Sequence, residues 1–264
     1  KKRLRFMKRQ KSKLIEQRNQ VLLEQIKQLK SDHPFWGYRR IWSYLKFREE
    51  IPVNKKRVYR LMQAEGLLVS RESRLRAKRG PYKPKPRAEY PNQIWGIDMT
   101  KVKLPTWGWL YLVVVLDWYT KEIVGCSLGL QSKTEDWLKT LNQAVMERFP
   151  RGIRESLHKP LYLISDNGCQ PTSESFMKNS QVLGIKQIFT TWSNPKGNSD
   201  TERVIRTIKE DLFWSYDWDN PFDLDDRLKN WVSDYNSDYP HQSLHNFTPK
   251  QFYENHIYKE LVLT

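Results

Sequence analysis

A succession of short apolar runs, each bounded by turn-forming residues, most constrains what this chain can fold into. Three β-rich runs come first, at Ile94–Val102, Leu110–Asp117 and Glu122–Leu128. Short stretches that contain Pro, Gly or Lys separate them. Because short connections join antiparallel neighbours, the three runs predict a meander of three strands.

Helices and strands alternate after this meander. Asp136–Phe149 has helical spacing, Leu161–Ser165 is a short apolar strand, and Glu174–Leu183 and Ile185–Phe189 repeat the helix–strand pair. A last helix is expected to begin around Ser199, after a polar loop that contains Gly. This order predicts an α/β layer arrangement. The first of these helices is expected to pack through its apolar side, which carries Trp137, Leu138, Leu141, Val145 and Met146.

The charge of the chain is uneven. Residues 1–90 carry 27 Lys and Arg against 8 Asp and Glu, whereas residues 91–264 carry 19 against 22. A basic front joined to a slightly acidic body indicates a polyanionic partner, and nucleic acid is the leading candidate. A membrane surface is less favoured, because no basic helix has a broad apolar face and no apolar run reaches the roughly 18 residues of a membrane span.

The basic front contains a helix-turn-helix candidate between residues 31 and 70. A first helix opens at Gly37 and carries Ile41, Tyr44 and Leu45 on one face. Pro52 ends it, and Asn54 can cap a second helix that packs through Val58, Leu61 and Met62. The opposite face of the second helix is cationic, which suits a recognition helix in a DNA groove. An ordinary helical hairpin with a solvated basic face is the alternative.

Two further segments flank this candidate. Residues 14–30 place Leu14, Val21, Leu22, Ile26 and Leu29 at near-helical spacing, which predicts an amphipathic helix that continues an oligomerising coil or contacts DNA. Residues 71–90 are rich in Arg and Lys and contain three prolines, which indicates an extended basic linker that could follow a DNA groove.

Three acidic residues stand where the predicted elements could bring them together. Asp98 lies in the middle of the first apolar strand, Asp166 directly follows the strand Leu161–Ser165, and Glu202 lies in the first turn of the last helix. A carboxylate in a core strand must be paired or bound to metal. Taken singly, each has an ordinary alternative: a salt bridge for Asp98, a turn cap for Asp166 and a helix-dipole partner for Glu202.

Together, the three acids suit a pair of divalent ions. Mg²⁺ prefers oxygen ligands and is usually held by a few carboxylates, waters and phosphate oxygens. Two metals roughly 3.5–4 Å apart can stabilise both the attacking and the leaving oxygen of a phosphoryl displacement. We therefore predict that Asp98, Asp166 and Glu202 bind Mg²⁺ or Mn²⁺, two ions per active site.

The segments around these acids resemble a known family. WGIDMT, SDNG and GNSDTERVIRTIKEDL are similar to the signature segments of retroviral integrases and insertion-sequence transposases, and 35 residues separate Asp166 from Glu202, as is common in that superfamily. The segment HPFWGYRRIWSYLKFREEIPVNKKRVYRLMQAEGLL resembles the helix-turn-helix of frameshift-type insertion-sequence transposases, and YNSDYPHQSLHNFTPKQFY resembles their C-terminal segment. The resemblance covers residues 31–254.

The resemblance implies a ribonuclease H-like fold, with a mixed five-stranded sheet and flanking helices, preceded by an all-α helix-turn-helix domain. It implies a DNA transposase in which Asp98, Asp166 and Glu202 are catalytic, acting on double-stranded transposon ends and target DNA as a homo-oligomer, at least a dimer. The expected parts are residues 1–30 as the N-terminal helix, 31–70 as the helix-turn-helix domain, 71–91 as the basic linker, 92–213 as the catalytic core and 214–264 as a C-terminal extension.

The DNA-binding prediction rests on basic residues of the front, the linker and the last helix. Similarity to integrases implies that Arg206 and Lys209, which share a helix face with Glu202, touch DNA near the metals; a solvated, salt-bridged face is the alternative. The other predicted DNA-binding residues are Arg39, Arg40, Lys55, Lys56, Arg57, Arg60, Arg76, Lys78, Arg79, Lys83 and Lys85.

Several other residues compete for roles or depart from the family pattern. Many relatives have an Asp-Asn pair several residues before the glutamate. In this chain Asp200 stands only two residues before Glu202, and it is a candidate to assist the metal site. Glu210 and Asp211 compete as the third acid but lie two turns beyond Glu202. Trp192 could stack on a splayed base or pack in the core. His241 and His245 resemble the family's tail, and packing or capping is the favoured role for both.

The cysteines and the first residues bear on the compartment. Cys126 and Cys169 cannot build a disulfide framework, fit a reducing cytoplasm, and are expected to be inert packing residues. The His and Cys spacing of the zinc module of retroviral integrases is missing, so no zinc is expected. KKRLRFMKRQ lacks the apolar stretch of a secretory signal, and we expect a bacterial cytoplasmic protein without membrane partners.

Two other functions remain open at this point. A ribonuclease H or resolvase on the same scaffold would share the metals but would not join DNA ends. A domesticated relative that only binds DNA would lack catalysis, although the intact set of acids argues against it.

The charge division gives a first prediction. A fragment of residues 1–90 is expected to bind duplex DNA with an affinity that falls steeply as salt rises, because several phosphates are neutralised. Residues 91–264 alone should bind far more weakly in the same buffer. Fluorescence anisotropy over a salt series measures both, and equal affinities at one salt concentration would contradict the prediction.

Overall fold

The computed structural model describes residues 13–69, 86–156, 159–190 and 197–263, except for the side chains of residues 13–15, 155, 259–261 and 263. The chain divides into two compact units, Lys1–Ser73 and Arg74–Thr264. The basic linker segment, apart from residues 86–91, lies outside the described residues.

The N-terminal unit contains helices α1 (Lys13–Asp32), α2 (Tyr38–Phe47) and α3 (Lys55–Ala64). The Asn54 side chain caps α3 by accepting a hydrogen bond from the Lys56 amide (2.8 Å), as expected. Gly66, with φ of +68°, follows the end of α3. The apolar faces of the three helices form one core, with the buried residues Leu22, Ile26, Trp36, Ile41, Leu45, Val58 and Met62. The all-α character predicted for this part is confirmed.

The predicted apolar face of α1 needs one correction. Leu22 and Ile26 are buried against α3, whereas Val21 is exposed to 60%. Residues 22 and 26 are one helical turn apart, and Val21 points about 100° away from Leu22 around the axis. The buried stripe of α1 is therefore narrower than the sequence pattern indicated.

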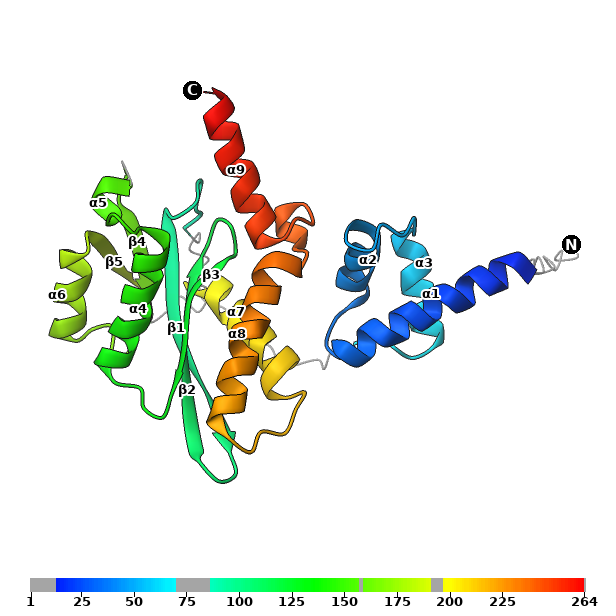
Figure 1. The fold of residues 1–264 in the computed structure, drawn as a ribbon, viewed down its shortest axis with the longest axis horizontal. Coiled ribbons are helices and arrows are strands. Elements are labelled where there is room, and N and C mark those ends of the chain that lie inside the picture. The colour runs from blue at the N-terminus through cyan, green and yellow to red at the C-terminus, as the bar shows by residue number, and fades with distance from the viewer. Residues whose placement is uncertain (1–12, 70–85, 157–158, 191–196, 264) are drawn as a thin grey trace, which may run out of the picture. The chain divides into compact units, whose positions relative to one another are not determined.

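The second unit is built on a five-stranded mixed sheet with strand order β3-β2-β1-β4-β5 (Figure 1). β1 pairs antiparallel with β2, and β2 pairs antiparallel with β3, which confirms the meander. β4 pairs parallel with β1, and β5 pairs parallel with β4. The strands are β1 (Ile94–Leu104), β2 (Gly108–Asp117), β3 (Ile123–Gly129), β4 (Leu161–Ser165) and β5 (Ile185–Phe189).

Helices α4 (Thr134–Arg148) and α6 (Glu174–Val182) cover one face of the sheet (Figure 1). A short helix, α5 (Ile153–Ser156), precedes β4. The core of this face combines strand residues such as Trp95 and Ile97 with the apolar side of α4. Met146 was expected on the buried, apolar side of α4, but its side chain is 72% exposed. The buried stripe of α4 therefore ends at Val145.

The helix α7 (Ser199–Ile208) packs on β1 and β2 and is followed by one π-helical turn, η1 (Lys209–Phe213). Val204, Ile205, Ile208 and Leu212 are all buried, as predicted for the sheet-facing side of this helix. A π-turn inserts one extra residue and rotates everything after it relative to a regular helix. The residues from Lys209 onward therefore leave the helical phase on which the sequence prediction relied.

The chain continues beyond the last predicted helix. It forms α8 (Pro221–Asp238), a 3₁₀ turn η2 (Gln242–Leu244) and α9 (Pro249–Leu263). The Asn236 side chain on α8 accepts a hydrogen bond from the Ile123 amide (3.0 Å) and donates one to the Ile123 carbonyl (3.0 Å). This amide satisfies a backbone pair on the edge strand β3, which would otherwise be open to another strand.

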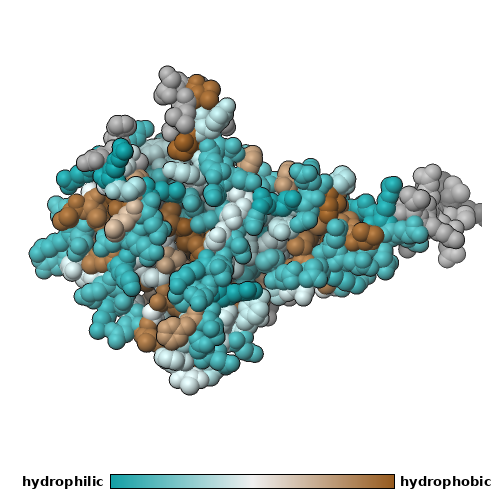
Figure 2. Space-filling view, viewed as in Figure 1, coloured by the Kyte–Doolittle hydropathy of each residue, from teal (hydrophilic) through white to brown (hydrophobic). Residues whose placement is uncertain are grey.

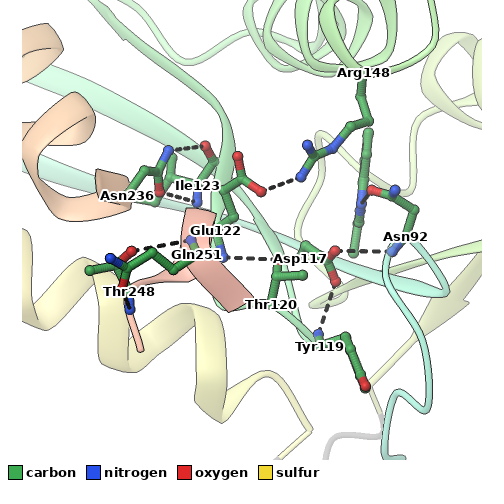
Figure 3. Close-up of polar contacts among 11 residues, drawn as sticks. Asn92, Asp117, Tyr119, Thr120, Glu122, Ile123, Arg148, Asn236, Thr248 and Gln251 are labelled. Atoms are coloured by element: carbon green, nitrogen blue, oxygen red, sulfur yellow. Dashed lines mark hydrogen bonds and ion pairs between the residues drawn. The ribbon is translucent and has the colours of Figure 1, made fainter. Parts of the chain in front are cut away.

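A buried carboxylate organises the start of β1 and the turn after β2. Asp117 is fully buried and accepts hydrogen bonds from the backbone amides of Asn92 (3.0 Å) and Tyr119 (2.9 Å) (Figure 3). Burial raises the pKa of Asp117 to about 6, and the hydrogen bonds from Asn92 and Tyr119 oppose that rise. Next to it, Glu122 forms an ion pair with Arg148 of α4 (Figure 3).

The surface is mostly hydrophilic in Figure 2, with separate hydrophobic patches. One of these patches lies over α6 and β5, where Met177, Val182 and Ile188 are exposed (Figure 2). β5 is at the edge of the sheet. Within the described part of the chain, no helix combines the length and the apolar character that crossing a bilayer requires.

Replacing the buried acid should destabilise the second unit. Asp117→Ala leaves two buried backbone amides without an acceptor, and we expect a loss of about 2–4 kcal/mol in the free energy of unfolding, measured with denaturant. Because folding raises the pKa of Asp117, this carboxyl group contributes most to stability at pH values below the ordinary pKa of Asp. The contribution declines as the pH rises to about 6. The deficit of the variant should therefore shrink between about pH 4 and pH 6 and change little at higher pH.

Asp217→Ala is the matched control, because Asp217 is an exposed acid in the segment before α8. It should change the unfolding free energy by less than about 0.5 kcal/mol. An Asp117→Ala deficit as small as that of the control would contradict the structural role of the buried carboxylate.

Candidate active site

The alternation of side chains along β1 determines where the first acid points. Trp95 and Ile97 belong to the core on the α4 side, so Gly96 and Asp98 face the opposite side of the sheet, where α7 packs. Asp98 is half-buried and pairs across the strand with Val114 of β2. One of its oxygens accepts a hydrogen bond from the Met99 amide (2.8 Å).

Gly96 lets the start of α7 approach β1 very closely. A Cβ atom at this position would lie 2.1 Å from Oγ1 of Thr201, 2.3 Å from Nε1 of Trp118 and 2.8 Å from Oδ1 of Asn198. Asn198 precedes α7, and its side chain donates a hydrogen bond to the Ile97 carbonyl (3.1 Å). A side chain at position 96 would push the helix away from the strand.

The three predicted acids affect one another electrostatically. The pKa of Asp98 is raised to about 7, mainly by burial, and further by the negative charges of Asp166 and Glu202. The Met99 amide and the positive charge of Lys209 oppose the rise. Residues distant in sequence thus lie within electrostatic range of Asp98, which is the most buried of the three acids.

Asp166 and Glu202 are both exposed. Asp166 directly follows β4, and one of its oxygens accepts a hydrogen bond from the Gly168 amide (3.0 Å). Gly168 has no side chain, and a Cβ there would lie 3.0 Å from the same oxygen. Glu202 is in the first turn of α7, where the positive end of the helix dipole favours a carboxylate.

The chemistry of these side chains fits a hard divalent cation. All three side chains supply carboxylate oxygens. In Asp98 and Asp166, one of the two oxygens accepts a hydrogen bond from a backbone amide. Burial is the main cause of the raised pKa of Asp98, and a bound cation would relieve the repulsion from Asp166 and Glu202 that adds to it. In the described ranges, however, no three His, Cys, Asp or Glu side chains are grouped tightly enough to form a ready ligand cluster.

The basic residues of α7 and η1 differ in their surroundings. Lys209 begins the π-turn, is half-buried, and its charge acts on Asp98. Arg206 is exposed and forms an ion pair with Glu210 (2.7 Å). The salt bridge matches the ordinary alternative for Arg206, whereas Lys209 lies on the side of the acids.

Within the N-terminal unit, the predicted DNA-binding residues lie at α2 and α3. Arg39, Lys55, Lys56 and Arg60 are exposed, and Arg40 is half-buried. The Lys55 ammonium lies 5.0 Å from the centroid of the Trp42 ring, and the Arg40 guanidinium lies 5.6 Å from the centroid of the Trp36 ring.

Arg57 is turned toward α1. It is half-buried and donates a hydrogen bond from Nε to Oδ1 of Asn19 (2.9 Å), so this guanidinium joins two helices of the unit. Five other predicted DNA-binding residues lie outside the described residues, as does Trp192; the five are Arg76, Lys78, Arg79, Lys83 and Lys85.

The competing candidates have clear places in the structure. Asp200 forms a half-buried ion pair with Lys121 (2.9 Å), which ties it to the turn after β2. Glu210 pairs with Arg206, and Asp211 is buried in η1. His241 packs edge-on against Tyr235, with 5.1 Å between the ring centroids, as a packing role predicts.

The two cysteines are not alike. Burial raises the pKa of the Cys126 thiol to about 12, which suits the inert role expected of it. Cys169 is exposed and donates a hydrogen bond to Oε1 of Gln170 (3.2 Å). The expectation that both cysteines pack in the interior is therefore wrong for Cys169, because the turn after Gly168 carries it to the surface.

The sequence interpretation missed the residues that hold α7 in place. Gly96, Trp118, Asn198 and Thr201 form the contact between β1, the turn after β2 and the start of α7. One signal for it was available: a glycine inside an apolar strand often marks a close approach of another segment. Gly96 stands two residues before Asp98, within the WGID segment.

Comparison with known protein families agrees with this geometry. The family described as "HTH-like domain" matches residues 16–74, and families described as "Integrase core domain" match residues 88–195 and 183–249. The integrase core matches include Asp98, Asp166 and Glu202. The chain belongs to the insertion-sequence transposases with an integrase core domain.

Two curated insertion-element relatives match most of this chain. An uncharacterized 39.2 kDa protein of insertion element IS476 from Xanthomonas euvesicatoria is 26% identical over 239 residues, which cover 90% of this chain and 66% of that protein. The transposase InsD of insertion element IS2 from Escherichia coli is 24% identical over 226 residues, which cover 83% of this chain and 73% of InsD. The chain thus spans about two thirds to three quarters of these relatives.

A solved structure shares the fold. One chain of the simian T-cell lymphotropic virus intasome, determined by cryoEM in complex with the PP2A regulatory subunit B56 gamma, superimposes with a TM-score of 0.52 at 18% identity. The match covers 83% of this chain and 70% of that chain. The ribonuclease H-like fold expected from the sequence is confirmed, with its mixed five-stranded sheet.

The electrostatic coupling of the acids gives a second prediction. In metal-free protein Asp98 should titrate near pH 7, and the double variant Asp166→Asn/Glu202→Gln should lower its pKa, because two negative neighbours are removed. The value should stay above the ordinary range for Asp, since burial is the larger cause. Carbon-13 NMR of the carboxyl group measures the titration.

Asp219→Asn serves as the control for this titration, because Asp219 is an exposed acid after η1. It should leave the pKa of Asp98 unchanged. If the double variant titrates at the wild-type value, the three carboxylates do not act on one another as the structure indicates.

Proposed function

We propose that this transposase cuts DNA at the ends of its mobile element and joins those ends to target DNA, with Asp98, Asp166 and Glu202 as its catalytic carboxylates. The observation that carries the proposal is the electrostatic coupling of three acids from two strands and one helix. Membership of the transposase family and the basic front of the chain support it.

Asp98, Asp166 and Glu202 would hold divalent metal, Mg²⁺ or Mn²⁺, as two ions. Bound there, the metal would supply Lewis-acid activation of an attacking oxygen and charge stabilisation of the leaving oxygen. The protein's own part would be to orient the three carboxylates and to favour their charged form despite their repulsion. The helix dipole at Glu202 and the amides of Met99 and Gly168 contribute to that.

Basic residues would position the DNA. Lys209 lies on the side of the acids and would hold a phosphate near them, an orienting role that a cation with no lone pair can fill. Arg206 would help to hold the DNA by giving up its ion pair with Glu210 and binding a phosphate instead. In the N-terminal unit, the exposed basic residues of α2 and α3 would contact the duplex of the element ends, with the basic linker continuing along it.

The transposase would act as a homo-oligomer of at least two copies, because two element ends must be brought together for joining. The exposed apolar side chains Met177, Val182 and Ile188 on α6 and β5 give such an assembly a surface to bury.

A metal-dependent nuclease without joining activity is the second candidate, since it needs the same acids. The helical DNA-binding unit ahead of the core favours a transposase, because a general nuclease needs no dedicated recognition of element ends. Joining of DNA ends is the property that separates the two.

Replacing single acids tests the proposal. Asp98→Asn, Asp166→Asn and Glu202→Gln should each abolish cleavage and joining, a loss of more than about 10³-fold, because several kcal/mol of charge stabilisation disappear. DNA binding in anisotropy assays should change little. The assay incubates the protein with element ends, plasmid target and Mg²⁺ or Mn²⁺, and the junctions are then sequenced.

Glu210→Gln is the matched control, because Glu210 competes for the role of third acid and pairs with Arg206. It should retain most activity. Ca²⁺ should allow assembly but little chemistry, and a chelator should stop the reaction. Near-normal joining by any of the three acid variants would remove that residue from the site, and cleavage without any junctions would favour the nuclease.

A further inference from the structure

We propose that the turn between β2 and β3 is a clamp that fixes the position of Glu202, with Trp118 and Lys121 as positioning residues. The clamp consists of these two residues and their partners on α7, Asp200 and Thr201. This inference rests on the proposed function of Glu202. It concerns how the carboxylate is held rather than the identity of the carboxylate.

The first contact is between Trp118 and Thr201. The indole Nε1 donates a hydrogen bond to Oγ1 of Thr201 (3.2 Å), and both side chains are buried. The Trp118 amide donates to the Ile94 carbonyl (2.9 Å), so the turn is also tied to β1. Since Gly96 has no Cβ, the indole and the threonine meet directly over the strand.

The second contact is between Lys121 and Asp200. Their ion pair has a length of 2.9 Å, and the two side chains are only 20% and 25% exposed. The Lys121 ammonium also donates to the Trp118 carbonyl, which joins the two halves of the clamp. Lys121 has φ of +62°, a left-handed conformation that costs energy in a non-glycine residue. A surrounding structure must compensate for that cost.

Hydrogen bonds to Asp117 and Thr120 hold the turn itself in place. Asp117 accepts a hydrogen bond from the Tyr119 amide, and the Lys121 amide donates to the Asp117 carbonyl (2.9 Å). Oγ1 of the buried Thr120 accepts a hydrogen bond from the Glu122 amide (3.3 Å). These contacts order the backbone that carries Trp118 and Lys121, as Figure 3 shows around Asp117 and Thr120.

The clamp acts next to the acid it positions. Thr201 directly precedes Glu202, and Asp200 stands one residue further back, in the first turn of α7. The Asn198 side chain makes no capping hydrogen bond to this turn and donates to the Ile97 carbonyl instead. Contacts to the turn after β2 therefore fix the axial and rotational position of the first helical turn. Displacing a reacting group by about 1 Å can cost a factor of about 100 in rate.

Two variants remove the clamp without removing the turn. Lys121→Met keeps the length of the side chain and deletes its charge, and Trp118→Phe keeps an aromatic ring and deletes the donor. Lys121→Arg is the rescue variant, because a guanidinium can still pair with Asp200. Lys178→Met is the matched control, since the Lys178–Glu174 ion pair on α6 is exposed on both sides.

Three measurements on the full chain separate positioning from folding. Hydrogen exchange reports the amides of the first turn of α7, Mn²⁺ titration by calorimetry reports the metal site, and strand cleavage gives kcat and KM for DNA. Lys121→Met and Trp118→Phe should weaken Mn²⁺ binding about tenfold or more and lower kcat, while KM stays within about twofold. Amide exchange at residues 201–203 should quicken. Lys121→Arg and Lys178→Met should resemble wild type.

Unchanged exchange at residues 201–203 together with unchanged Mn²⁺ binding in both variants would overturn the clamp. If Lys121→Met fails to fold, as judged by thermal unfolding, Trp118→Phe decides by the same two criteria. If the wild-type chain neither cuts nor joins DNA, the proposed function fails. The exchange measurement still decides whether the turn after β2 holds the start of α7.

Discussion

The contact of α7 with β1 at Gly96 is the constraint on which the candidate active site depends. A strand carries Asp98, and a helix from a remote part of the chain carries Glu202, so their meeting requires the helix to lie almost on the strand. The missing side chain at Gly96 permits that approach, and the nearest atoms of Thr201 and Trp118 occupy the space that a Cβ would fill. Any residue larger than glycine would separate the two acids.

That approach has an electrostatic cost. Burial of Asp98, together with the negative charges of Asp166 and Glu202, raises the pKa of Asp98 toward neutrality, so the metal-free site carries less negative charge than three free carboxylates. Because folding raises this pKa, ionising Asp98 lowers the stability of the folded state as the pH passes about 7. A bound divalent cation would reverse that balance, and metal binding would then release a proton. The metal-free site thus lowers the stability of the folded state, and a bound divalent cation would raise it.

In the proposed function, the two units of the chain divide the work of DNA binding and chemistry. The helical N-terminal unit buries a small apolar core and keeps most of its predicted DNA-binding residues exposed, whereas Arg57 is used to join α3 to α1. The second unit has little excess of positive charge, and Lys209 is the basic residue whose charge acts on Asp98. Under that proposal, the attraction of DNA and the positioning of its phosphates near the acids rest on different residues.

The sequence by itself determined the strands of the meander and the helix–strand alternation, because side-chain periodicity and turn residues are local signals. It also gave the prediction of the three acids. It also located β4 and β5 at their observed bounds. Only the tertiary structure decided the rest. The exposure of Val21 and Met146 depends on which neighbouring element covers a helix, and the local spacing of apolar residues does not reveal the π-turn at Lys209. The clamp of Trp118 and Lys121 joins residues about 80 positions from their partners, so it exists only once β2, β3 and α7 have come together.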